Sequence, residues 1–367
     1  MNKIPLVDLR ANYLSIKEDI DDAIQKVIND SAFIMGSYLK EFESNFARFC
    51  KAKHAIGCSS GTTALHLALL AAGIKKGDEV ITVPNTFIAT TEAISHVGGK
   101  FRFVDVIEDT ALMDINKLEK AITRETKAII VVHLFGQMPD MDRIREITDD
   151  HNLLLIEDAA QAHGAEWKGH QPGYYGDIAT YSFFPAKILG CFGDGGAVIT
   201  NNNDLAEKVR LLVNHGRFTK YEHMIEGYNY RLDALQASIL NAKLKYLSKW
   251  IDQRRRNAKF YDENLPEMVK PIIEAKGAKH SYYMYVIRTP KRDELKKFLG
   301  EKGIGCGIHY PIPLHLQPAY SHLSYKKGDY PVAEKLSREI LSIPVYPELT
   351  SEQMNYIVNS IKEFFNH

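Results

Sequence analysis

Short apolar runs alternate with helical stretches through the middle of the chain, and this alternation limits the possible folds more than any other sequence feature. The apolar runs are His54–Cys58, Glu79–Val83, Lys100–Val104, Ala128–His133 and Leu153–Ile156. The helical stretches beside them are Thr62–Ala72, Thr86–His96 and Met141–His151. Strands that are apolar throughout and are separated by helices are typical of a parallel sheet covered on both faces. Such sheets bind ligands beyond the carboxyl ends of their strands.

The pattern changes after Asp233. Leu232–Asn264 has apolar residues at helical spacing and predicts one long helix. The later segments are predicted as an extended run at Tyr282–Arg288, a helix at Arg292–Gly300, an extended run at Ile304–Tyr310 and an amphipathic helix at Ser351–Phe365. We therefore predict an α/β protein whose large domain, residues 1–240, is built on a mostly parallel sheet. Residues 241–367 would form the long helix and a smaller α+β domain, on which the N-terminal residues can pack.

Charge balance and cysteine spacing exclude several classes of protein. Lysine plus arginine equals aspartate plus glutamate, at 46 each, so the chain lacks the basic excess of nucleic-acid-binding proteins. The four cysteines form no Cys-x-x-Cys pair, which indicates free thiols in a reducing cytoplasm and no metal site. The longest apolar stretch, beginning at Ala128, is about half the length of a membrane span, and the N-terminus resembles no signal peptide. We expect a cytoplasmic protein without nucleic-acid or membrane partners.

Two residues near the predicted sheet edge indicate a specific chemistry. Asp158 follows the strand Leu153–Ile156, where a buried carboxylate is costly unless it has a partner. Lys187 lies between the aromatic-rich segment Thr180–Phe184 and a glycine-rich turn, where lost hydration lowers the pKa of an amine and makes its nucleophilic form accessible. Pyridoxal phosphate needs both groups, because a lysine holds its aldehyde as a Schiff base and a carboxylate keeps its pyridine nitrogen protonated.

A phosphate site is the third requirement of this cofactor. Ser59–Leu65 follows a short strand and opens a helix, and backbone N–H groups at a helix start bind anions. Taken singly, each signal has an ordinary explanation: the turn as a helix cap, the acid as a capping or salt-bridged carboxylate, the lysine as a solvated side chain. The order of the three along the chain favours pyridoxal phosphate.

With these residues in place, the sequence resembles the sugar aminotransferases of the DegT/DnrJ/EryC1/StrS family, which have the aspartate-aminotransferase fold, fold type I of the pyridoxal-phosphate enzymes. The blocks that support the resemblance run nearly end to end: Ile4–Leu9, Phe33–Gly36, Ser60–Thr62, Gly77–Ile81, Glu157–Gln161, Ser182–Lys187, Gly193–Ala197, Asn229–Asp233, Gln236–Ala237 and His309–Leu314. Ala186 is a conservative departure, since many relatives have Gly or Ser there.

The resemblance implies a role for each matching residue. Lys187 would form the Schiff base and move a proton between substrate and cofactor, Asp158 would face the pyridine nitrogen and Gln161 the phenolic oxygen. The other cofactor contacts would be Ser60, Gly61, Thr62, Phe87, Ser182 and, from the neighbouring subunit of a homodimer, Asn229. The sugar–nucleotide pocket would be lined by Tyr221, His223, Arg231, His309 and Tyr310. From sequence alone, Phe87 could equally be a core residue, and the substrate residues could be packing or surface groups.

The same resemblance implies a ping-pong transamination. L-glutamate would give its amino group to the cofactor, and the keto carbon of a nucleotide-linked sugar would then accept it, yielding an amino sugar for surface polysaccharide or lipopolysaccharide synthesis. The blocks His309–Pro318, Ser182–Gly196 and Asn214–Gly216, with Tyr221 and His223, are most similar to enzymes that aminate C3 of UDP-linked 2-acetamido-3-keto sugars. The alternatives are dTDP-linked 3-keto-6-deoxyhexoses and 4-keto sugars.

Three other classes of protein share part of this sequence pattern. A catalytically silent or regulatory relative would be indicated by a lost lysine or an appended DNA-binding segment, and we expect neither. In the sugar 3-dehydratases a histidine replaces the lysine, so Lys187 argues against that branch. A nicotinamide-dependent dehydrogenase would need Gly-x-Gly-x-x-Gly at the start of its first βαβ unit, whereas the glycines from Gly190 to Gly196 follow the lysine.

Overall fold

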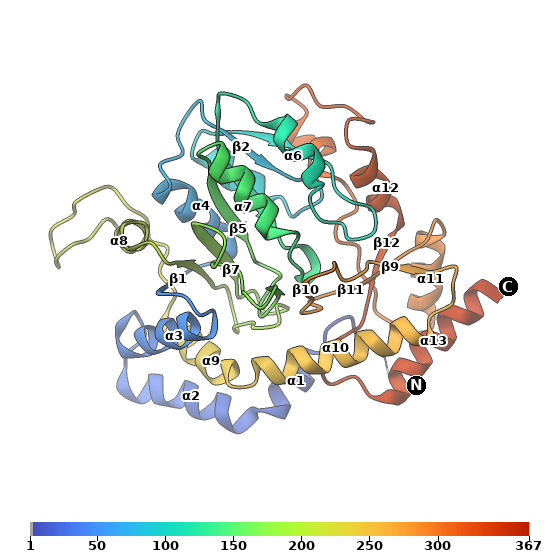
Figure 1. Cartoon of the computed structure of the whole chain (residues 1–367). Helices are drawn as coiled ribbons and strands as arrows, with labels where there is room; N and C mark the ends of the chain where they lie inside the picture. The colour runs from blue at the N-terminus through green and yellow to red at the C-terminus, as the bar shows by residue number, and fades with distance from the viewer. Residues whose placement is uncertain (1–2, 367) are drawn as a thin grey trace.

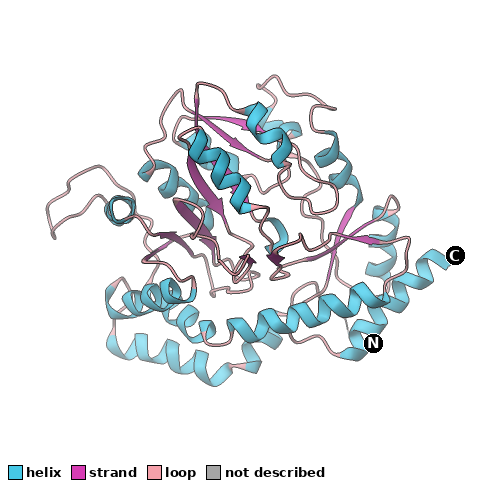
Figure 2. Cartoon of the chain, in the orientation of Figure 1, coloured by secondary structure: helices cyan, strands magenta, loops and turns pink. Residues whose placement is uncertain are grey.

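The computed structural model describes residues 3–366 and has a seven-stranded sheet at its centre (Figure 1 and Figure 2). In spatial order the strands are β1 (His54–Cys58), β8 (Gly196–Thr200), β7 (Ile178–Ser182), β5 (Leu154–Asp158), β4 (Thr126–Val132), β2 (Glu79–Thr82) and β3 (Lys100–Phe103). Neighbouring strands from β7 to β3 are parallel, whereas β8 is antiparallel to both β1 and β7. The prediction of an α/β fold with a mostly parallel sheet is confirmed.

Both faces of this sheet are buried. The helices associated with it are α4 (Gly61–Ala71), α5 (Ala89–His96), α6 (Ile115–Ala121), α7 (Met141–Asp150) and α8 (Asn203–Leu212). On β4, Ile129 and Val131 belong to one hydrophobic cluster, and Ala128 and Ile130 belong to another. Because successive residues of a strand point to opposite faces, a sheet covered on both sides needs strands that are apolar throughout.

A further layer of helices lies along one side of the molecule in Figure 1: α1 (Leu9–Ser15), α2 (Lys17–Asp30), α3 (Gly36–Phe49), α9 (Ala234–Leu244) and α10 (Leu247–Asn264). The prediction of a single helix over Leu232–Asn264 is wrong, because the chain turns at Lys245 and Tyr246. The Tyr246 hydroxyl donates to Asp19 of α2 and its ring stacks on Trp250, so the turn is held by side-chain contacts. This turn lets α9 pack on α2 and α3 while α10 reaches α13 (Ser351–Asn366).

The C-terminal part contains a three-stranded antiparallel sheet, in the order β12 (Ile340–Ile343), β11 (Tyr285–Arg288) and β9 (Lys270–Pro271). The helices α11 (Arg292–Glu301), α12 (Pro331–Glu339) and α13 pack around it. The segment predicted as extended, Ile304–Tyr310, forms isolated bridges rather than a strand, and one of them joins Ile304 to Ile4. Ile4 belongs to the hydrophobic cluster of this part. The domain boundary at residue 240 stays a prediction, and residues 1, 2 and 367 lie outside the described range.

Short elements complete the chain and connect its two parts. The strands β6 (Glu166–Trp167) and β10 (Ala278–Lys279) pair with each other across the two parts. The 3-10 turns are η1 (Leu134–Gly136), η2 (Leu314–Leu316) and η3 (Pro318–Tyr320). Within residues 3–366, no helix has the combined length and apolar character needed to cross a membrane. Because η1 directly follows β4, it lies at the carboxyl edge of the sheet, where a ligand is expected.

Candidate active site

A cavity of about 420 Å³ opens beyond the carboxyl ends of β1, β4, β5 and β7. The residues predicted for the site that line it are Ser60, Gly61, Thr62, Phe87, Asp158, Gln161, Ser182, Lys187 and Tyr310. The other lining residues were not predicted as site residues: Leu65, Thr86, Ala89, Val132, His133, Ala160, Phe184, Asp194 and Tyr283. The volume lies in the range of small-molecule sites, and the predicted acid and lysine share this one cavity.

Asp158 ends β5 and presents a buried carboxylate to the cavity. Its Oδ2 accepts a hydrogen bond from Thr90 Oγ1 at 2.9 Å, and its Oδ1 accepts one from the Ala160 backbone nitrogen at 3.2 Å. Burial raises the pKa of this carboxyl, and the two hydrogen bonds and the charge of Lys187 oppose that shift. A cation at the open side of the carboxylate would stabilise its ionised form, which is what a protonated ring nitrogen supplies.

Lys187 lies in the loop between β7 and β8. Burial lowers the pKa of its amine to about 8, and the negative charge of Asp158 opposes this shift. The Nζ atom lies 4.4 Å from the centroid of the Tyr283 ring. An amine with a pKa close to neutrality can act as a nucleophile, and it can also release and take up a proton.

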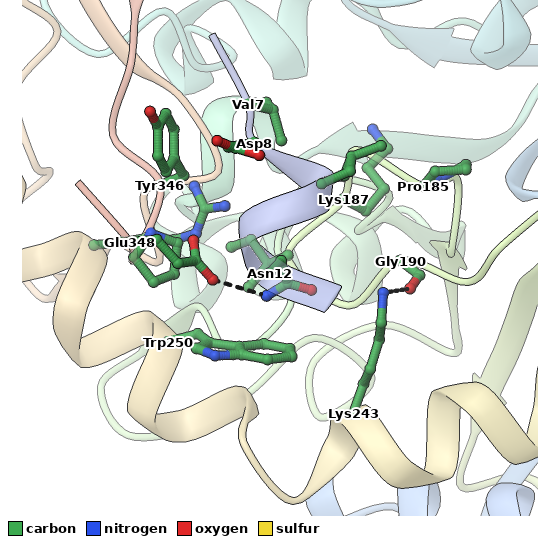
Figure 3. A pocket seen from close by; sticks show the side chains of 14 residues that line it. Val7, Asp8, Asn12, Pro185, Lys187, Gly190, Lys243, Trp250, Tyr346 and Glu348 are labelled. Atoms are coloured by element: carbon green, nitrogen blue, oxygen red, sulfur yellow. Dashed lines mark hydrogen bonds between the residues drawn. The ribbon is translucent and has the colours of Figure 1, made fainter. Parts of the chain in front are cut away.

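The loop that carries Lys187 is also held by a hydrogen bond from α9. Figure 3 shows this contact in a second pocket of about 20 Å³, which Lys187, Gly190 and Lys243 line. Lys243 of α9 is buried, and its Nζ donates to the Gly190 carbonyl at 2.7 Å. The same Nζ lies 4.5 Å from the centroid of the Phe192 ring, and burial lowers its pKa to about 8. The hydrogen bond from a buried amine therefore fixes the chain three residues after the proposed reactive lysine.

The N-terminus of α4 forms one wall of the cavity. Ser60 caps this helix, since its Oγ accepts from the Thr63 nitrogen at 3.1 Å while Thr63 Oγ1 accepts from the Ser60 nitrogen at 2.9 Å. A Cβ on Gly61 would lie 2.7 Å from Ser182 Cβ, so the helix start approaches β7 as closely as it does because residue 61 is a glycine. The cap and the anion site are compatible, because Gly61 and Thr62 at the start of the helix still line the cavity.

Gln161, Tyr310 and Phe87 lie on the remaining walls. Gln161 Oε1 accepts from the Phe135 backbone nitrogen at 2.8 Å, and its Nε2 donates to the Tyr310 hydroxyl at 3.2 Å. The Phe87 ring is 53% exposed and lies 5.6 Å, centroid to centroid, from the Tyr310 ring. Phe87 is therefore a wall of the cavity and not a core residue.

These groups fit pyridoxal phosphate. The amine, the buried carboxylate and the helix N-terminus match its aldehyde, its pyridine nitrogen and its phosphate, and the Gly61 position brings the helix start close to Ser182, the other residue predicted to bind the phosphate. Residues 14–362 match the DegT/DnrJ/EryC1/StrS aminotransferase family. The chain belongs to this family.

Members of the DegT/DnrJ/EryC1/StrS family resemble the chain along its whole length. It is 48% identical over 368 residues to the "Pleiotropic regulatory protein" of Geobacillus stearothermophilus, covering 99% of each chain. It is 43% identical over 360 residues to the UDP-N-acetyl-3-dehydro-alpha-D-glucosamine 3-aminotransferase of Acidithiobacillus ferrooxidans, covering 98% of this chain and 97% of the relative. DesV of Streptomyces venezuelae, solved with a ketimine intermediate, has a TM-score of 0.98 and 39% identity over 100% of both chains.

The resemblance seen in the sequence is thus confirmed, together with the fold type and the cofactor. The chain is a pyridoxal-phosphate-dependent sugar aminotransferase of the DegT/DnrJ/EryC1/StrS family, with the fold of its solved relatives. The name of the Acidithiobacillus ferrooxidans relative specifies a UDP-linked sugar as the substrate of that enzyme.

Several residues predicted for this aminotransferase do not line the cavity of the single chain. Asn229 and His223 are exposed, and Tyr221 is 82% exposed, all on the segment between α8 and α9 that projects from the body in Figure 1. Arg231 Nη1 donates to Asn214 Oδ1 at 2.9 Å, and His223 Nδ1 lies 2.7 Å from the His215 carbonyl. Their roles stay predictions.

His309 precedes the cavity residue Tyr310 and is half-buried. Its Nδ1 lies 2.8 Å from the Ser342 hydroxyl oxygen. Burial lowers the pKa of this imidazole to about 4, with a smaller contribution from the charge of Lys187. His309 is therefore a neutral group close to the proposed reactive amine, and its role toward a sugar stays a prediction.

A buried pair beside Asp158, His133 and Glu157, was not predicted from the sequence. His133 lines the cavity, and its Nε2 lies 2.7 Å from Glu157 Oε2, with both side chains fully buried. The second oxygen of Glu157 accepts from the backbone nitrogens of Gly173 and Gly176 at 2.8 and 2.7 Å. The two acidic residues at the end of β5 therefore have different roles. The Glu157 carboxylate has all its partners inside the protein, whereas the Asp158 carboxylate lines the cavity and faces the ligand. The only signal for this in the sequence was the position of His133 at the end of an apolar run.

Proposed function

We propose that this aminotransferase moves an amino group from L-glutamate to C3 of a UDP-linked 2-acetamido-3-keto sugar, within surface polysaccharide or lipopolysaccharide synthesis. The observation that carries the transamination is the shared cavity of Lys187 and Asp158. Support for the sugar comes from the block His309–Leu314 and from the Acidithiobacillus ferrooxidans relative, whose name specifies a 3-dehydro UDP sugar.

The chain's own residues divide the work of binding from that of proton transfer. Bound pyridoxal phosphate supplies an electron sink for the substrate carbon. Gly61, Thr62 and Ser182 bind its phosphate, and Asp158 holds the proton of its ring nitrogen. Phe87 and Gln161 fix the plane and the edge of its ring.

Lys187 moves the proton in each half of the reaction. Its pKa of about 8 means that both its neutral and its charged form are populated near neutral pH. The neutral amine takes a proton from the carbon of glutamate, and the ammonium form returns a proton to the former keto carbon of the sugar. A pKa near neutrality therefore allows the same lysine to act as the base toward glutamate and as the acid toward the sugar.

The active unit is proposed to be a homodimer with active sites at the subunit interface. The segment between α8 and α9 presents exposed apolar side chains, among them Phe218 at 67%, Tyr221 at 82% and Met224 at 60% exposure. Exposed apolar groups gathered on one projecting segment are typical of an interface. Asn229 and Arg231, which lie on the same segment, would then reach the neighbouring subunit's cofactor and sugar.

A substrate panel tests the proposal. The purified chain is loaded with pyridoxal phosphate and given L-glutamate with UDP-linked 2-acetamido-3-keto, dTDP-linked 3-keto-6-deoxy and 4-keto sugars, and 2-oxoglutarate and amino sugar are measured. We expect the UDP-linked 3-keto sugar to have the highest kcat/KM. A preference for a dTDP-linked or 4-keto sugar would contradict the substrate assignment. Cofactor binding without turnover of any sugar would instead favour a regulatory protein.

A further inference from the structure

The ring of Tyr283 lies against the amine of Lys187. The Nζ atom is 4.4 Å from the ring centroid, and both side chains line the main cavity. Tyr283 comes from the segment between β10 and β11, whereas Lys187 follows β7, so this contact joins the C-terminal part to the central sheet. An ammonium group above an aromatic face is stabilised by the quadrupole of the ring.

Hydrogen bonds to η1 hold the Tyr283 segment on one side. The Ser281 backbone nitrogen and hydroxyl both donate to the Gly136 carbonyl, at 2.7 and 3.1 Å. The Met284 nitrogen donates to the Phe135 carbonyl at 3.3 Å. Gly136 has a φ of +107°, and a Cβ there would lie 2.6 Å from Ser281 Oγ and 3.0 Å from the Tyr283 nitrogen. This close approach requires glycine.

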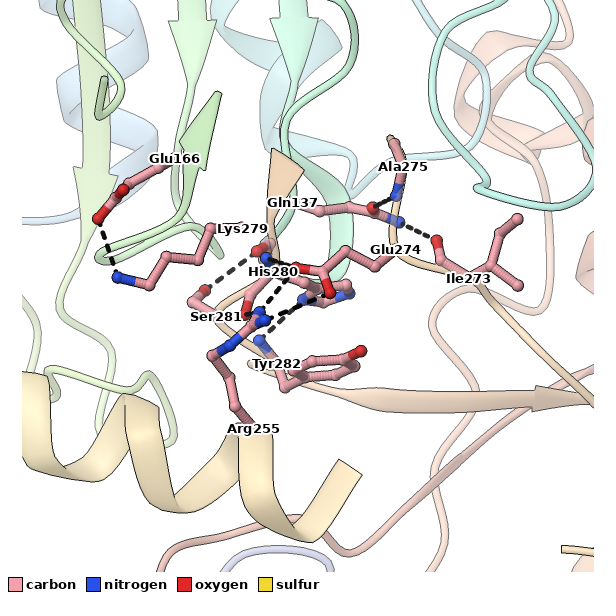
Figure 4. Close-up of polar contacts among 11 residues, drawn as sticks. Gln137, Glu166, Arg255, Ile273, Glu274, Ala275, Lys279, His280, Ser281 and Tyr282 are labelled. Carbon is pink, nitrogen blue, oxygen red and sulfur yellow. Dashed lines mark hydrogen bonds and ion pairs between the residues drawn. The ribbon is translucent and has the colours of Figure 1, made fainter. Parts of the chain in front are cut away.

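Two arginines of α10 hold the segment on the other side. Arg254 Nη1 donates to the carbonyls of Tyr282 and Tyr283, at 3.2 and 3.3 Å. Arg255 Nη1 donates to the His280 carbonyl at 2.7 Å, as Figure 4 shows. With its backbone fixed from both sides, Tyr283 keeps its ring beside the amine without help from a ligand.

We propose that Tyr283 is a further catalytic residue whose ring face stabilises the ammonium form of Lys187. That form is the acid which returns a proton to the sugar carbon, so the catalytic meaning of the contact rests on the proposed function. Loss of the ring would shift Lys187 toward its neutral form and weaken the acid.

The titratable groups that are coupled electrostatically to Lys187 are Asp158, His163 and His309. Lys187 also shares the main cavity with His133 and Asp194, and the second pocket with Asp8, Lys243, Arg254 and Glu348. The Asp158 carboxylate also favours the ammonium form. Burial lowers the pKa of His163 to about 3 and that of His309 to about 4, so both imidazoles are neutral at the working pH. Tyr283 itself stays neutral, since burial raises the pKa of its hydroxyl to about 12. The aromatic face of Tyr283 and the carboxylate of Asp158 therefore both favour the charged amine.

The test measures the pH at which Lys187 becomes reactive in the full-length chain freed of pyridoxal phosphate. An acylating reagent is applied over a series of pH values, and mass spectrometry of the Lys187 peptide gives the titration midpoint. Tyr283→Leu removes the aromatic face, and its midpoint should fall by roughly half a pH unit to one and a half pH units. Tyr283→Phe keeps the face and should keep the midpoint of the parent chain.

Phe184→Leu is the matched control, because it removes a ring from the wall of the same cavity without removing the contact with Nζ. Tyr283→Met is the second non-aromatic variant if Tyr283→Leu does not fold, as judged by circular dichroism. An unchanged or raised midpoint in the non-aromatic variants overturns the proposal. It is also overturned if Tyr283→Phe or Phe184→Leu shifts the midpoint by the same amount. Because no substrate is present, these outcomes leave the proposed function untouched.

Discussion

Burial sets the chemistry of two residues in opposite directions. It lowers the pKa of the Lys187 amine and raises the pKa of the Asp158 carboxyl, while the charge of each partner opposes the shift of the other. The Lys187 amine is thus kept close to the pH at which it changes charge, and the Asp158 carboxyl holds a proton more readily than a solvated aspartate does. A cofactor that presents an aldehyde to the amine and a basic ring nitrogen to the acid uses this state directly.

The pH dependence of cofactor uptake follows from the pKa of Lys187. Only the neutral amine forms a Schiff base, and the neutral fraction rises as pH approaches the pKa of about 8 from below. When pyridoxal phosphate is added to the cofactor-free chain, the rate of Schiff-base formation, followed by absorbance, should rise roughly tenfold per pH unit below the midpoint and level off above it. A rate that still rises toward the pKa of a solvated lysine, 10.5, would contradict the burial argument.

Replacing the amine should separate cofactor binding from catalysis. Lys187→Ala leaves Asp158, Gly61 and Ser182 in place, so pyridoxal phosphate should still bind, as measured by equilibrium dialysis. Turnover should fall by several orders of magnitude, because the variant has lost both its nucleophile and its acid–base group. Borohydride should tag one lysine in the parent chain and none in the variant. Schiff-base absorbance that persists in Lys187→Ala would refute the assignment.

Part of the site could be predicted because the signal was local. Asp158 ends a strand and Lys187 follows one, so both lie at the carboxyl edge of the sheet by connectivity alone. Tyr283 and His133 could not be predicted, since Tyr283 reaches Lys187 through an anchor on η1 and His133 depends on a partner on another strand. Such contacts depend on how distant segments pack, which one sequence does not reveal.

At the scale of elements, the phosphate site depends on how closely the start of α4 packs against β7. Gly61→Ala places a Cβ 2.7 Å from Ser182 Cβ, so the helix start or the strand must move. Overpacking of this kind costs about 1–3 kcal/mol. If this cost falls on the cofactor-binding conformation, the affinity for pyridoxal phosphate, measured by titration, should fall by roughly fivefold to about a hundredfold.

Gly300→Ala is the matched control for that variant. Gly300 lies in α11, and a Cβ there would meet no atom within 4 Å. The control should bind pyridoxal phosphate as the parent chain does. Equal affinities for Gly61→Ala and the parent chain would mean that the helix start does not form the phosphate site.

The sequence predicted where helices and strands lie better than it predicted where a helix is interrupted or which way a strand runs in the sheet. β8 runs opposite to its neighbours, yet all five of its residues are buried, so its apolar run would look the same in either direction. The turn between α9 and α10 escaped notice because the apolar spacing continues through it, and it depends on the contact of Tyr246 with α2. No prediction was made for α1–α3, whose packing partner α9 lies far along the sequence.

At the scale of the whole molecule, one chain holds an incomplete version of the predicted site. Lys187, Asp158 and the α4 cradle share a cavity, whereas Asn229 and Tyr221 are exposed on a projecting segment. A homodimer that exchanges these segments would give each cofactor a lysine from one subunit and an asparagine from the other. Closed two-fold symmetry would then form two equivalent sites.

Mixed dimers test this arrangement. Lys187→Ala inactivates the site of its own chain, and Asn229→Ala would weaken the site of its neighbour. In a mixed dimer of the two variants, one site carries both defects and the other carries none. Random exchange makes half of the dimers mixed, so activity should recover to on the order of a quarter of that of the parent enzyme. If mixing restores no activity beyond the sum of the separate variants, while size-exclusion chromatography shows that subunits have exchanged, Asn229 serves its own chain or no cofactor at all.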